Sequence, residues 1–563
     1  MGVIKRKFES TSASRDDYDP ATGACSIECF VSFQDKYRFA PLGRMTTPWP
    51  YTTTRVSPMA RDIKRKITSE YEAILRKYDI TMVDSHMQRM SPKHTTAEGR
   101  DVLIIVSDDL DTTRWLAAAT EIQAAIDRRV GMANTDLKMR VEIRNFEAMY
   151  RDYSFAVKAD TPECQVLAKA QSIVHAELAR LNATQWTTIG CAMRGRERED
   201  SDNKPTVVVC FPPGSKYLYD YLAGKVESAL EPLDTANSGL ALQVEFMPGL
   251  LIPSISAEMR PAAPVFAGYD YKHPDCGFSI GPRGARDAGT AGIWVWFRKP
   301  GQPRQLAMLT CHHVVVSGDP GRRAVHDTYG IGLQGNNVPN PIVVDYPAPF
   351  DEAYTEEVLS NQANPAFNTP EQVAKNTESL AGMKKMKQDG GFGRVIHASG
   401  YHRRVQGRRM DWAIIAVRNP SFRGTNDAVP RTELTFEMLW NNRVNYQAQA
   451  GTFISGIGPG NEGTWVVKKG RTTRVTVGEI TALKTICHWQ DNSQSYEDVA
   501  ELYKGGDPFA TGGDSGSIVY NMEKQWVGMI IGEKTISCAG IFTPVDALLA
   551  DIREQTGGSI ELL

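Results

Sequence analysis

The sequence has 563 residues, of which 41% are hydrophobic and 23% are charged, with a formal net charge of −2. This length predicts about two to four domains, and the near-neutral charge offers no attraction for nucleic acid or an anionic membrane. No apolar run approaches the roughly 20 residues of a membrane-spanning helix, and no apolar stretch follows the basic N-terminal residues as in a secretory signal. We therefore expect a soluble protein with neither a nucleic-acid nor a membrane partner.

The nine cysteines are scattered along the chain without a repeating framework. Several lie in apolar, strand-like runs, such as Cys210 in TVVVCF. This distribution favours free thiols in a reducing compartment over disulfides, so we expect an intracellular, cytoplasmic protein. Cys25 and Cys29 lie four apart, but no second Cys/His pair follows nearby, and we expect no metal and no cofactor.

The N-terminal half is predicted to be a poorly ordered arm followed by a duplicated α/β domain. Residues 1–55 are polar and without sustained periodicity, typical of an arm or of a strap on the next domain. Over 56–250, the order helix–strand–strand–helix–strand occurs twice, and the two copies could share one sheet. The two units span about 57–147 and 163–248, with helices predicted over 62–78, 111–129, 163–181 and 217–231. Neither unit contains a Gly-rich phosphate loop, and we expect a structural or partner-binding domain.

The C-terminal half is predicted to be a β domain. Residues 251–289 are rich in Pro, Gly and Ala, which indicates a linker and domain entry. From 290 to 563 the sequence is a series of short alternating runs divided by turn residues, typical of a β-barrel or sandwich. A polar, helical pattern over about 350–388 predicts an insertion, and 546–554 predicts a closing helix.

Three short stretches of this β domain carry residue types suited to acyl transfer. TGGDSGS (511–517) places Ser515 in a Gly-rich turn, where backbone N–H groups can hold an oxyanion. His313 closes the apolar run LAMLTCHH, and Asp411 opens DWAIIAV. A serine nucleophile needs a histidine base and a carboxylate that orients it, and the chain order His, Asp, Ser fits the chymotrypsin arrangement.

Taken together, these motifs resemble the trypsin-like serine proteases over about residues 268–563. TCHHV (310–314), DWAII (411–415), TGGDSGSIV (511–519) and FTPVDALLADI (542–552) are similar to four segments of that family. GRTTRVTVGEI (470–480) resembles a strand pair of intracellular, often fungal, members. The resemblance implies a double β-barrel with a C-terminal helix.

Carried onto this sequence, the resemblance implies a catalytic triad of His313, Asp411 and Ser515. The N–H groups of Gly513 and Ser515 would form the oxyanion hole. The adjacent His312 is expected to be structural, because successive residues of a strand face opposite sides. Asp345, which also borders an apolar strand, is the main rival to Asp411.

Departures from secreted relatives bear on compartment, activation and specificity. Val314 and Thr511 stand where secreted members carry disulfide cysteines. The linker contains no Ile-Val-Gly-Gly-like sequence whose freed terminus could insert against Asp514, which disfavours that activation route. Phe509 stands where trypsin carries the acid that reads Arg or Lys, and it favours an apolar or small side chain.

These observations predict an intracellular serine endopeptidase that acts on a protein or peptide substrate, with an N-terminal domain that regulates it or recruits a protein partner. Two alternatives stay open. One is a catalytically silent pseudoprotease scaffold. The other is a sensor or adaptor protein whose protease domain is its effector.

Overall fold

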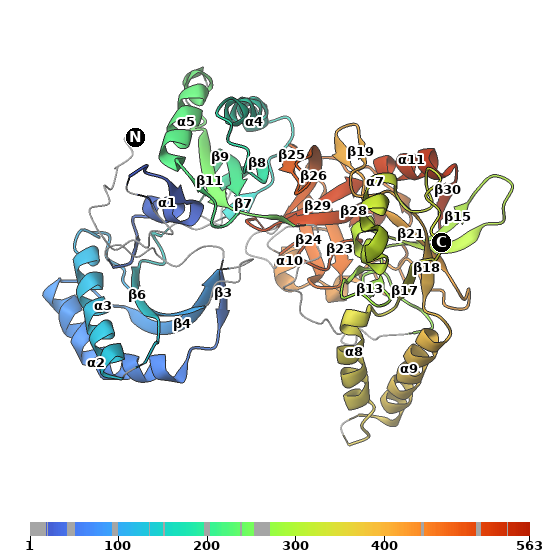
Figure 1. Ribbon diagram of the computed structural model, residues 1–563, viewed down its shortest axis with the longest axis horizontal. Coiled ribbons are helices and arrows are strands. Elements are labelled where there is room, and N and C mark those ends of the chain that lie inside the picture. The colour runs from blue at the N-terminus through green and yellow to red at the C-terminus, as the bar shows by residue number, and fades with distance from the viewer. Residues whose placement is uncertain are drawn as a thin grey trace.

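The computed structural model describes most of the chain, with gaps in the N-terminal segment and in several loops. Along the sequence it forms two α/β units and a larger β domain (Figure 1). Among the described helices, none combines the length and the hydropathy that a membrane crossing requires. The described residues are 19, 21–41, 51–92, 99–133, 135–149, 153–195, 203–236, 239–252, 271–366, 368–440, 444–502, 508–537 and 539–563.

The first α/β unit is a five-stranded sheet with helices α2 and α3 on one face. Helix α2 begins where the Ser57 hydroxyl accepts a hydrogen bond from the Ala60 N–H, with Pro58 in the first turn. The sheet order is β2-β6-β5-β4-β3, with β5 and β6 parallel. Its elements are β2 (Arg38–Phe39), β3 (Tyr51–Thr54), α2 (Pro58–Lys77), β4 (Asp84–Pro92), β5 (Arg100–Val106), α3 (Trp115–Met132) and β6 (Met139–Arg144).

The second unit has the same order of helices and strands and the same pairing. Helix α4 again begins at a hydroxyl, Thr161, followed by Pro162. Strands β8 and β9 are antiparallel, β9 and β11 are parallel, and α4 and α5 pack on one face. Its elements are β7 (Tyr153–Phe155), α4 (Pro162–Arg180), β8 (Thr188–Gly195), β9 (Lys204–Phe211), α5 (Tyr219–Ala236) and β11 (Gln243–Pro248).

The two units do not share one sheet, contrary to the possibility raised by the sequence. The first unit keeps its own sheet, whereas β8 of the second pairs with β25 (Thr485–His488) of the β domain. A further strand, β12 (Leu251–Ile252), pairs with β28 (Gln525–Lys534). The second unit and the β domain therefore share a continuous 13-stranded sheet, because an edge strand can extend any sheet whose outer N–H and C=O groups are free.

Parts of the segment predicted to be a poorly ordered arm or a strap form regular elements. β1 (Cys25–Ser26) and α1 (Ile27–Gln34) place Ile27 and Cys29 in the core of the second unit. β2 then pairs with β6 of the first unit. The apolar residues of this stretch are buried, so residues 21–41 link the two units rather than form a loose arm.

The β domain contains two antiparallel sheets, which fit the predicted trypsin-like domain. In the first, the strand order is β14-β13-β17-β18-β21-β16-β15-β30. These strands are β13 (Ser279–Pro282), β14 (Gly289–Thr290), β15 (Trp294–Arg298), β16 (Gln305–Thr310), β17 (Val343–Asp345), β18 (Gly393–Ala398), β21 (Ala413–Val417) and β30 (Ser559–Leu562).

The second sheet closes on itself. Strand β23 pairs with β24, and the pairing continues through β26, β29, β28 and β27 back to β23. Closure removes the sheet edges of this barrel. The strands are β23 (Trp465–Gly470), β24 (Arg474–Ile480), β26 (Gln494–Leu502), β27 (Ile518–Asn521), β28 and β29 (Ala539–Pro544).

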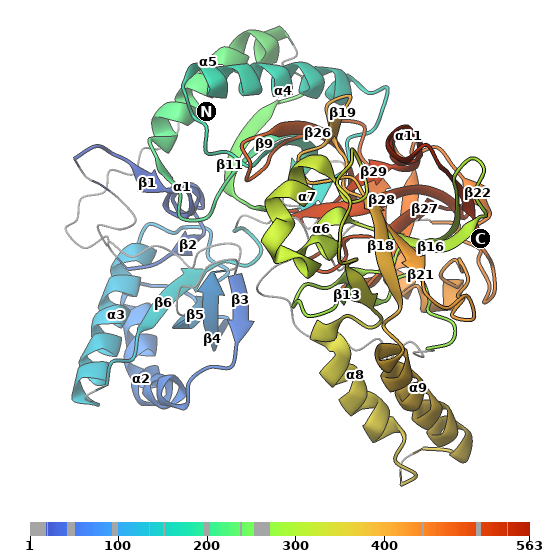
Figure 2. The same cartoon turned by 45° about the vertical axis from the view of Figure 1, so that its right-hand side comes forward.

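Helices interrupt and close the β domain. In the segment predicted as an insertion, α8 (Pro349–Gln362) and α9 (Pro370–Gln388) lie side by side and extend away from the barrels (Figures 1 and 2). Helix α11 (Val545–Thr556) follows β29 and precedes β30, which pairs with β15. Strand β30 therefore belongs to the first sheet, although helix α11, which precedes it, directly follows strand β29 of the second sheet.

Candidate active site

The segment that carries His312 and His313 leaves the strand earlier than the sequence pattern indicates. β16 ends at Thr310, and residues His312–Val315 form the short helix α6. The prediction that the two histidines alternate across a strand is therefore wrong in its geometry. Their side chains still diverge, because consecutive residues of a helix differ in direction by about 100°.

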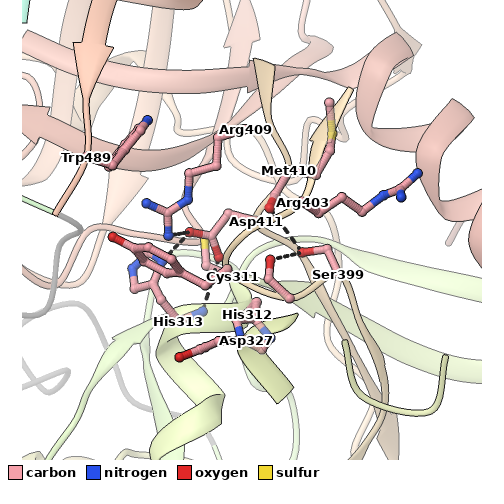
Figure 3. Close-up of polar contacts among 12 residues, drawn as sticks. Cys311, His312, His313, Asp327, Ser399, Arg403, Arg409, Met410, Asp411 and Trp489 are labelled. Carbon is pink, nitrogen blue, oxygen red and sulfur yellow. Dashed lines mark hydrogen bonds and ion pairs between the residues drawn. The ribbon is translucent and has the colours of Figure 1, made fainter. Parts of the chain in front are cut away.

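His313 and Asp411 are brought together at the ends of two paired strands of the first sheet: His313 follows β16, and Asp411 precedes β21. The Nδ1 atom of His313 lies 2.6 Å from Oδ2 of Asp411, and its backbone N–H donates to Oδ1 at 3.1 Å (Figure 3). Both side chains are buried. The two contacts fix the orientation of the imidazole and leave Nε2 as its free ring nitrogen.

His312 points to a different partner. Its Nε2 atom lies 2.9 Å from Oδ1 of Asp327, a residue of α7 (Arg323–Tyr329), and burial lowers its pKa despite that carboxylate. Asp345, the alternative candidate for the triad acid, forms an ion pair with Arg283, with Nη2 and Oδ1 2.7 Å apart. Neither therefore competes with the pair formed by His313 and Asp411.

A buried arginine that the sequence reasoning missed supports Asp411. Arg409 donates from Nη2 to Oδ2 of Asp411 at 3.0 Å, and both side chains are fully buried. Its guanidinium lies 3.6 Å from the ring centroid of Tyr401 and 4.3 Å from that of Trp489. Burial alone would raise the pKa of Asp411, but the charges of His313 and Arg409 outweigh it and hold that pKa well below its ordinary value.

Ser515 lies in a loop between β26 and β27 that packs closely against Thr310, the last residue of β16 and three residues before His313. The Thr290 N–H donates to the Ser515 carbonyl at 2.8 Å, and any Cβ at Gly516 would meet Thr310 Oγ1 at 2.4 Å. Gly516 has φ of +93°, so this close approach requires glycine. Within the described chain, the Ser515 hydroxyl and Nε2 of His313 are buried and make no hydrogen bond.

The backbone of this loop has N–H groups without an acceptor among the described residues. The N–H groups of Asp514, Gly516 and Ser517 all donate to carbonyls, those of Thr511, Ile530 and Asp514 respectively. Among the described residues, the N–H groups of Gly512, Gly513 and Ser515 have no acceptor; Gly512 is partly exposed, whereas Gly513 and Ser515 are buried. An oxyanion hole requires two such unpaired, fixed donors beside the nucleophile.

Cys311 places a thiol in the same cluster. Its Sγ donates to the Ile530 carbonyl at 3.1 Å, and burial raises its pKa well above the ordinary value. Cys311, His313 and Asp411 lie close enough to hold a metal ion, as the one such group among the described residues. The fit is poor, because the Asp411 oxygen already accepts from Arg409, whose fixed positive charge would repel a cation.

A second buried ion pair ties the Ser515 loop to the helical insertion. Arg471 donates from Nε and Nη2 to the two carboxylate oxygens of Asp351, each at 2.6 Å, at the start of α8. The Arg471 N–H donates to the Thr290 hydroxyl, which itself donates to the Gly513 carbonyl. Nothing in the local sequence of either residue signals this contact.

Phe509 is buried within the closed barrel. A Cβ at Gly478 of β24 or at Gly540 of β29 would meet the Phe509 ring at 2.7 Å, so the ring fills the space between β24 and β29. Its neighbours in the core include Val466, Ala510 and Phe542. Position 509, which we predicted to contact the substrate side chain, therefore carries an aromatic ring that fills space. It carries no negative charge that could bind the side chain of Lys or Arg.

Comparison with known proteins finds a family match in the C-terminal half and similarity to solved protease structures. Residues 307–560 match the model of peptidase family S64. No curated protein matches the chain significantly. The chain is similar to Thermobifida fusca protease A (16% identity, TM-score 0.25), a Nocardiopsis protease (11%, 0.26) and a Cellulomonas bogoriensis chymotrypsin (14%, 0.25).

Each of these matches covers 51% of this chain and 98% of the other protein. Because these TM-scores are low, the fold of this domain is assigned from its own strand pairings. The family match does not reach residues 1–306. Over residues 307–560, the chain is therefore similar to peptidase family S64, in agreement with the resemblance to serine proteases carried by its motifs.

Proposed function

We propose that this protein is a serine endopeptidase with His313, Asp411 and Ser515 as its catalytic triad. One observation carries the proposal: a buried His313–Asp411 pair at 2.6 Å lies beside a loop whose two N–H groups, at Gly513 and Ser515, have no acceptor in the described chain. The family match supplies the reaction class, hydrolysis of peptide bonds.

In the proposed mechanism, Nε2 of His313 takes the proton of the Ser515 hydroxyl as its oxygen attacks the scissile carbonyl carbon. The N–H groups of Gly513 and Ser515 hold the resulting oxyanion. His313 then gives the proton to the leaving amine, and the peptide C–N bond breaks to leave an acyl-enzyme. A water molecule, deprotonated by His313, attacks the acyl carbon and releases Ser515. Asp411 stays ionised and stabilises the imidazolium.

Substitution separates these roles. We expect Ser515→Ala and His313→Ala each to lower kcat by about a millionfold, as the members of a triad act as a unit. His312→Ala is the matched control, because its partner is Asp327 and not Asp411. Cleavage of a peptide library by purified full-length chain measures both activity and specificity. Equal losses for His312→Ala and His313→Ala would contradict the assignment of the base.

A catalytically silent scaffold is the competing function, and the presence of all three residue types disfavours it. Failure of the wild-type chain to cleave any library peptide, or to react with a serine-directed probe, would favour it. We also propose a reducing, intracellular setting, since all the cysteines that the structure describes are free thiols.

We further propose that the second α/β unit regulates the triad through strand β25. The His488 N–H at the end of β25 donates to the Thr187 carbonyl, and the next residue, Trp489, packs on Arg409. Arg409 in turn holds Asp411. A shift of β25 would therefore reach Asp411 through the ring of Trp489 and the guanidinium of Arg409.

Point substitutions test this regulation, because deletion of the N-terminal half would expose Ile486 and the edge of β25. Gln171 donates from Nε2 to the Lys484 and Ile189 carbonyls, both at 2.9 Å. We expect Gln171→Ala to alter kcat/KM, and Ser172→Ala, an exposed neighbour, to leave it unchanged. Equal kinetics for the two variants would remove the basis for regulation by this unit.

A further inference from the structure

The residue before the proposed nucleophile, Asp514, is a fully buried carboxylate with an unusually complete set of donors. Its Oδ1 accepts from the N–H groups of Thr472 at 2.8 Å and Thr473 at 3.2 Å. Its Oδ2 accepts from the Thr473 hydroxyl at 2.6 Å and the Thr511 N–H at 3.0 Å. These contacts hold the loop that carries Ser515 against the turn between β23 and β24.

A buried carboxylate also needs a positive charge, and Lys468 provides it. Lys468, on β23, is fully buried, and its Nζ lies 3.3 Å from Oδ2 of Asp514 and contacts the Thr473 hydroxyl. In the family that the sequence resembles, a freed chain terminus can supply this charge. Here the cation comes from the barrel wall.

The packing around this pair leaves little room for another arrangement. A Cβ at Gly470, two residues after Lys468, would meet Oδ1 of Asp514 at 2.4 Å. The Phe509 ring lies 5.8 Å from Nζ and covers it on another side. The pair is therefore enclosed, and the buried carboxylate and its cation compensate each other's charge.

We infer that Lys468 is a positioning residue that sets the oxyanion hole from within the chain, through Asp514, so that the Ser515 loop forms without release of a new N-terminus. This inference rests on the proposed function. Lys468 would touch neither the substrate nor the reacting atoms. Its charge fixes Asp514, and Asp514 fixes the directions of the N–H groups of Gly513 and Ser515.

The inference is tested on the full-length chain with Lys468→Met and Lys468→Arg. A donor of an oxyanion hole contributes about 10²–10³ in kcat, so we expect Lys468→Met to lower kcat by about 100-fold or more with KM nearly unchanged. Binding of a peptide boronate, which mimics the tetrahedral intermediate, should weaken by a similar factor. Lys468→Arg, which keeps the charge, should restore most of kcat, and Lys469→Met should resemble wild type.

A pH profile provides a second readout that does not need the Met variant to fold. Burial lowers the pKa of Lys468, and the charge of Asp514, its ionic partner, opposes this effect. Wild-type kcat should fall at high pH as the ammonium loses its proton, and Lys468→Arg should move this fall to higher pH because a guanidinium stays charged.

The outcomes separate the two hypotheses. An inactive wild-type chain would refute the proposed function. An active wild type whose high-pH profile is the same in Lys468→Arg, or a folded Lys468→Met with unchanged kcat, would overturn the inference alone.

Discussion

Substitution of Arg409 by methionine tests how the triad acid is held. The change removes a fully buried guanidinium 3.0 Å from Asp411 and keeps only an unbranched apolar side chain beside Tyr401 and Trp489. Removal of one partner from a buried ion pair costs about 3–5 kcal/mol, since the other charge is left uncompensated. We expect the free energy of unfolding to fall by about that amount, measured by urea denaturation.

The neighbouring Arg408 offers a matched control. It pairs with Asp498 at 2.8 Å, but its side chain is 19% exposed. Ion pairs near the surface contribute about 0–1 kcal/mol, so Arg408→Met should change the free energy of unfolding by less than Arg409→Met. Equal losses for the two variants would show that burial does not strengthen the contribution of the Arg409–Asp411 pair to stability.

Activity gives Arg409→Met a second signature. Without the guanidinium, the buried carboxylate of Asp411 loses one of the groups that hold it beside Nδ1 of His313. We therefore expect kcat/KM of Arg409→Met to fall well below that of Arg408→Met. Equal kcat/KM values for the two variants would show that Arg409 supports only the fold.

Two further predictions concern specificity and acid stability. Phe509→Ala should lower the free energy of unfolding by about 3–5 kcal/mol and open space beside the Ser515 loop. Cleavage of a peptide library should then shift toward substrates with larger apolar side chains. An unchanged cleavage profile in the folded variant would contradict a role of Phe509 in specificity. Burial lowers the pKa of His397 from 6.5 to about 4, so only the unfolded chain takes up this proton between those pH values. The free energy of unfolding should then fall as pH drops through that range, by at most about 3 kcal/mol, and urea titrations should show a smaller fall for His397→Gln than for the exposed His273→Gln.

The sequence reveals those parts of the site that are encoded in short local patterns. His313, Asp411 and Ser515 each sit in a recognisable stretch, and the short alternating runs predict the antiparallel sheets of the C-terminal half. Arg409, Lys468 and other supporting groups act through partners that are distant in sequence, and no local pattern marks a buried cation before its carboxylate is known.

The arrangement of the N-terminal half shows the same limit. The helices near 58–77 and 162–180 could be predicted from their periodicity and N-terminal hydroxyl residues. The pairing of β8 with β25 could not, because any edge strand offers the same backbone groups and tertiary packing selects its partner. The helix at His312–Val315 was missed because its valines favour a strand.

A fluorophosphonate probe, combined with mass spectrometry of the labelled peptide, tests whether Ser515 is an activated nucleophile. We expect one covalent adduct on Ser515 in the wild-type chain, none in Ser515→Ala, and greatly slowed labelling in His313→Ala. Equal labelling of the wild type and Ser515→Ala, or no labelling of the folded wild type, would contradict this expectation.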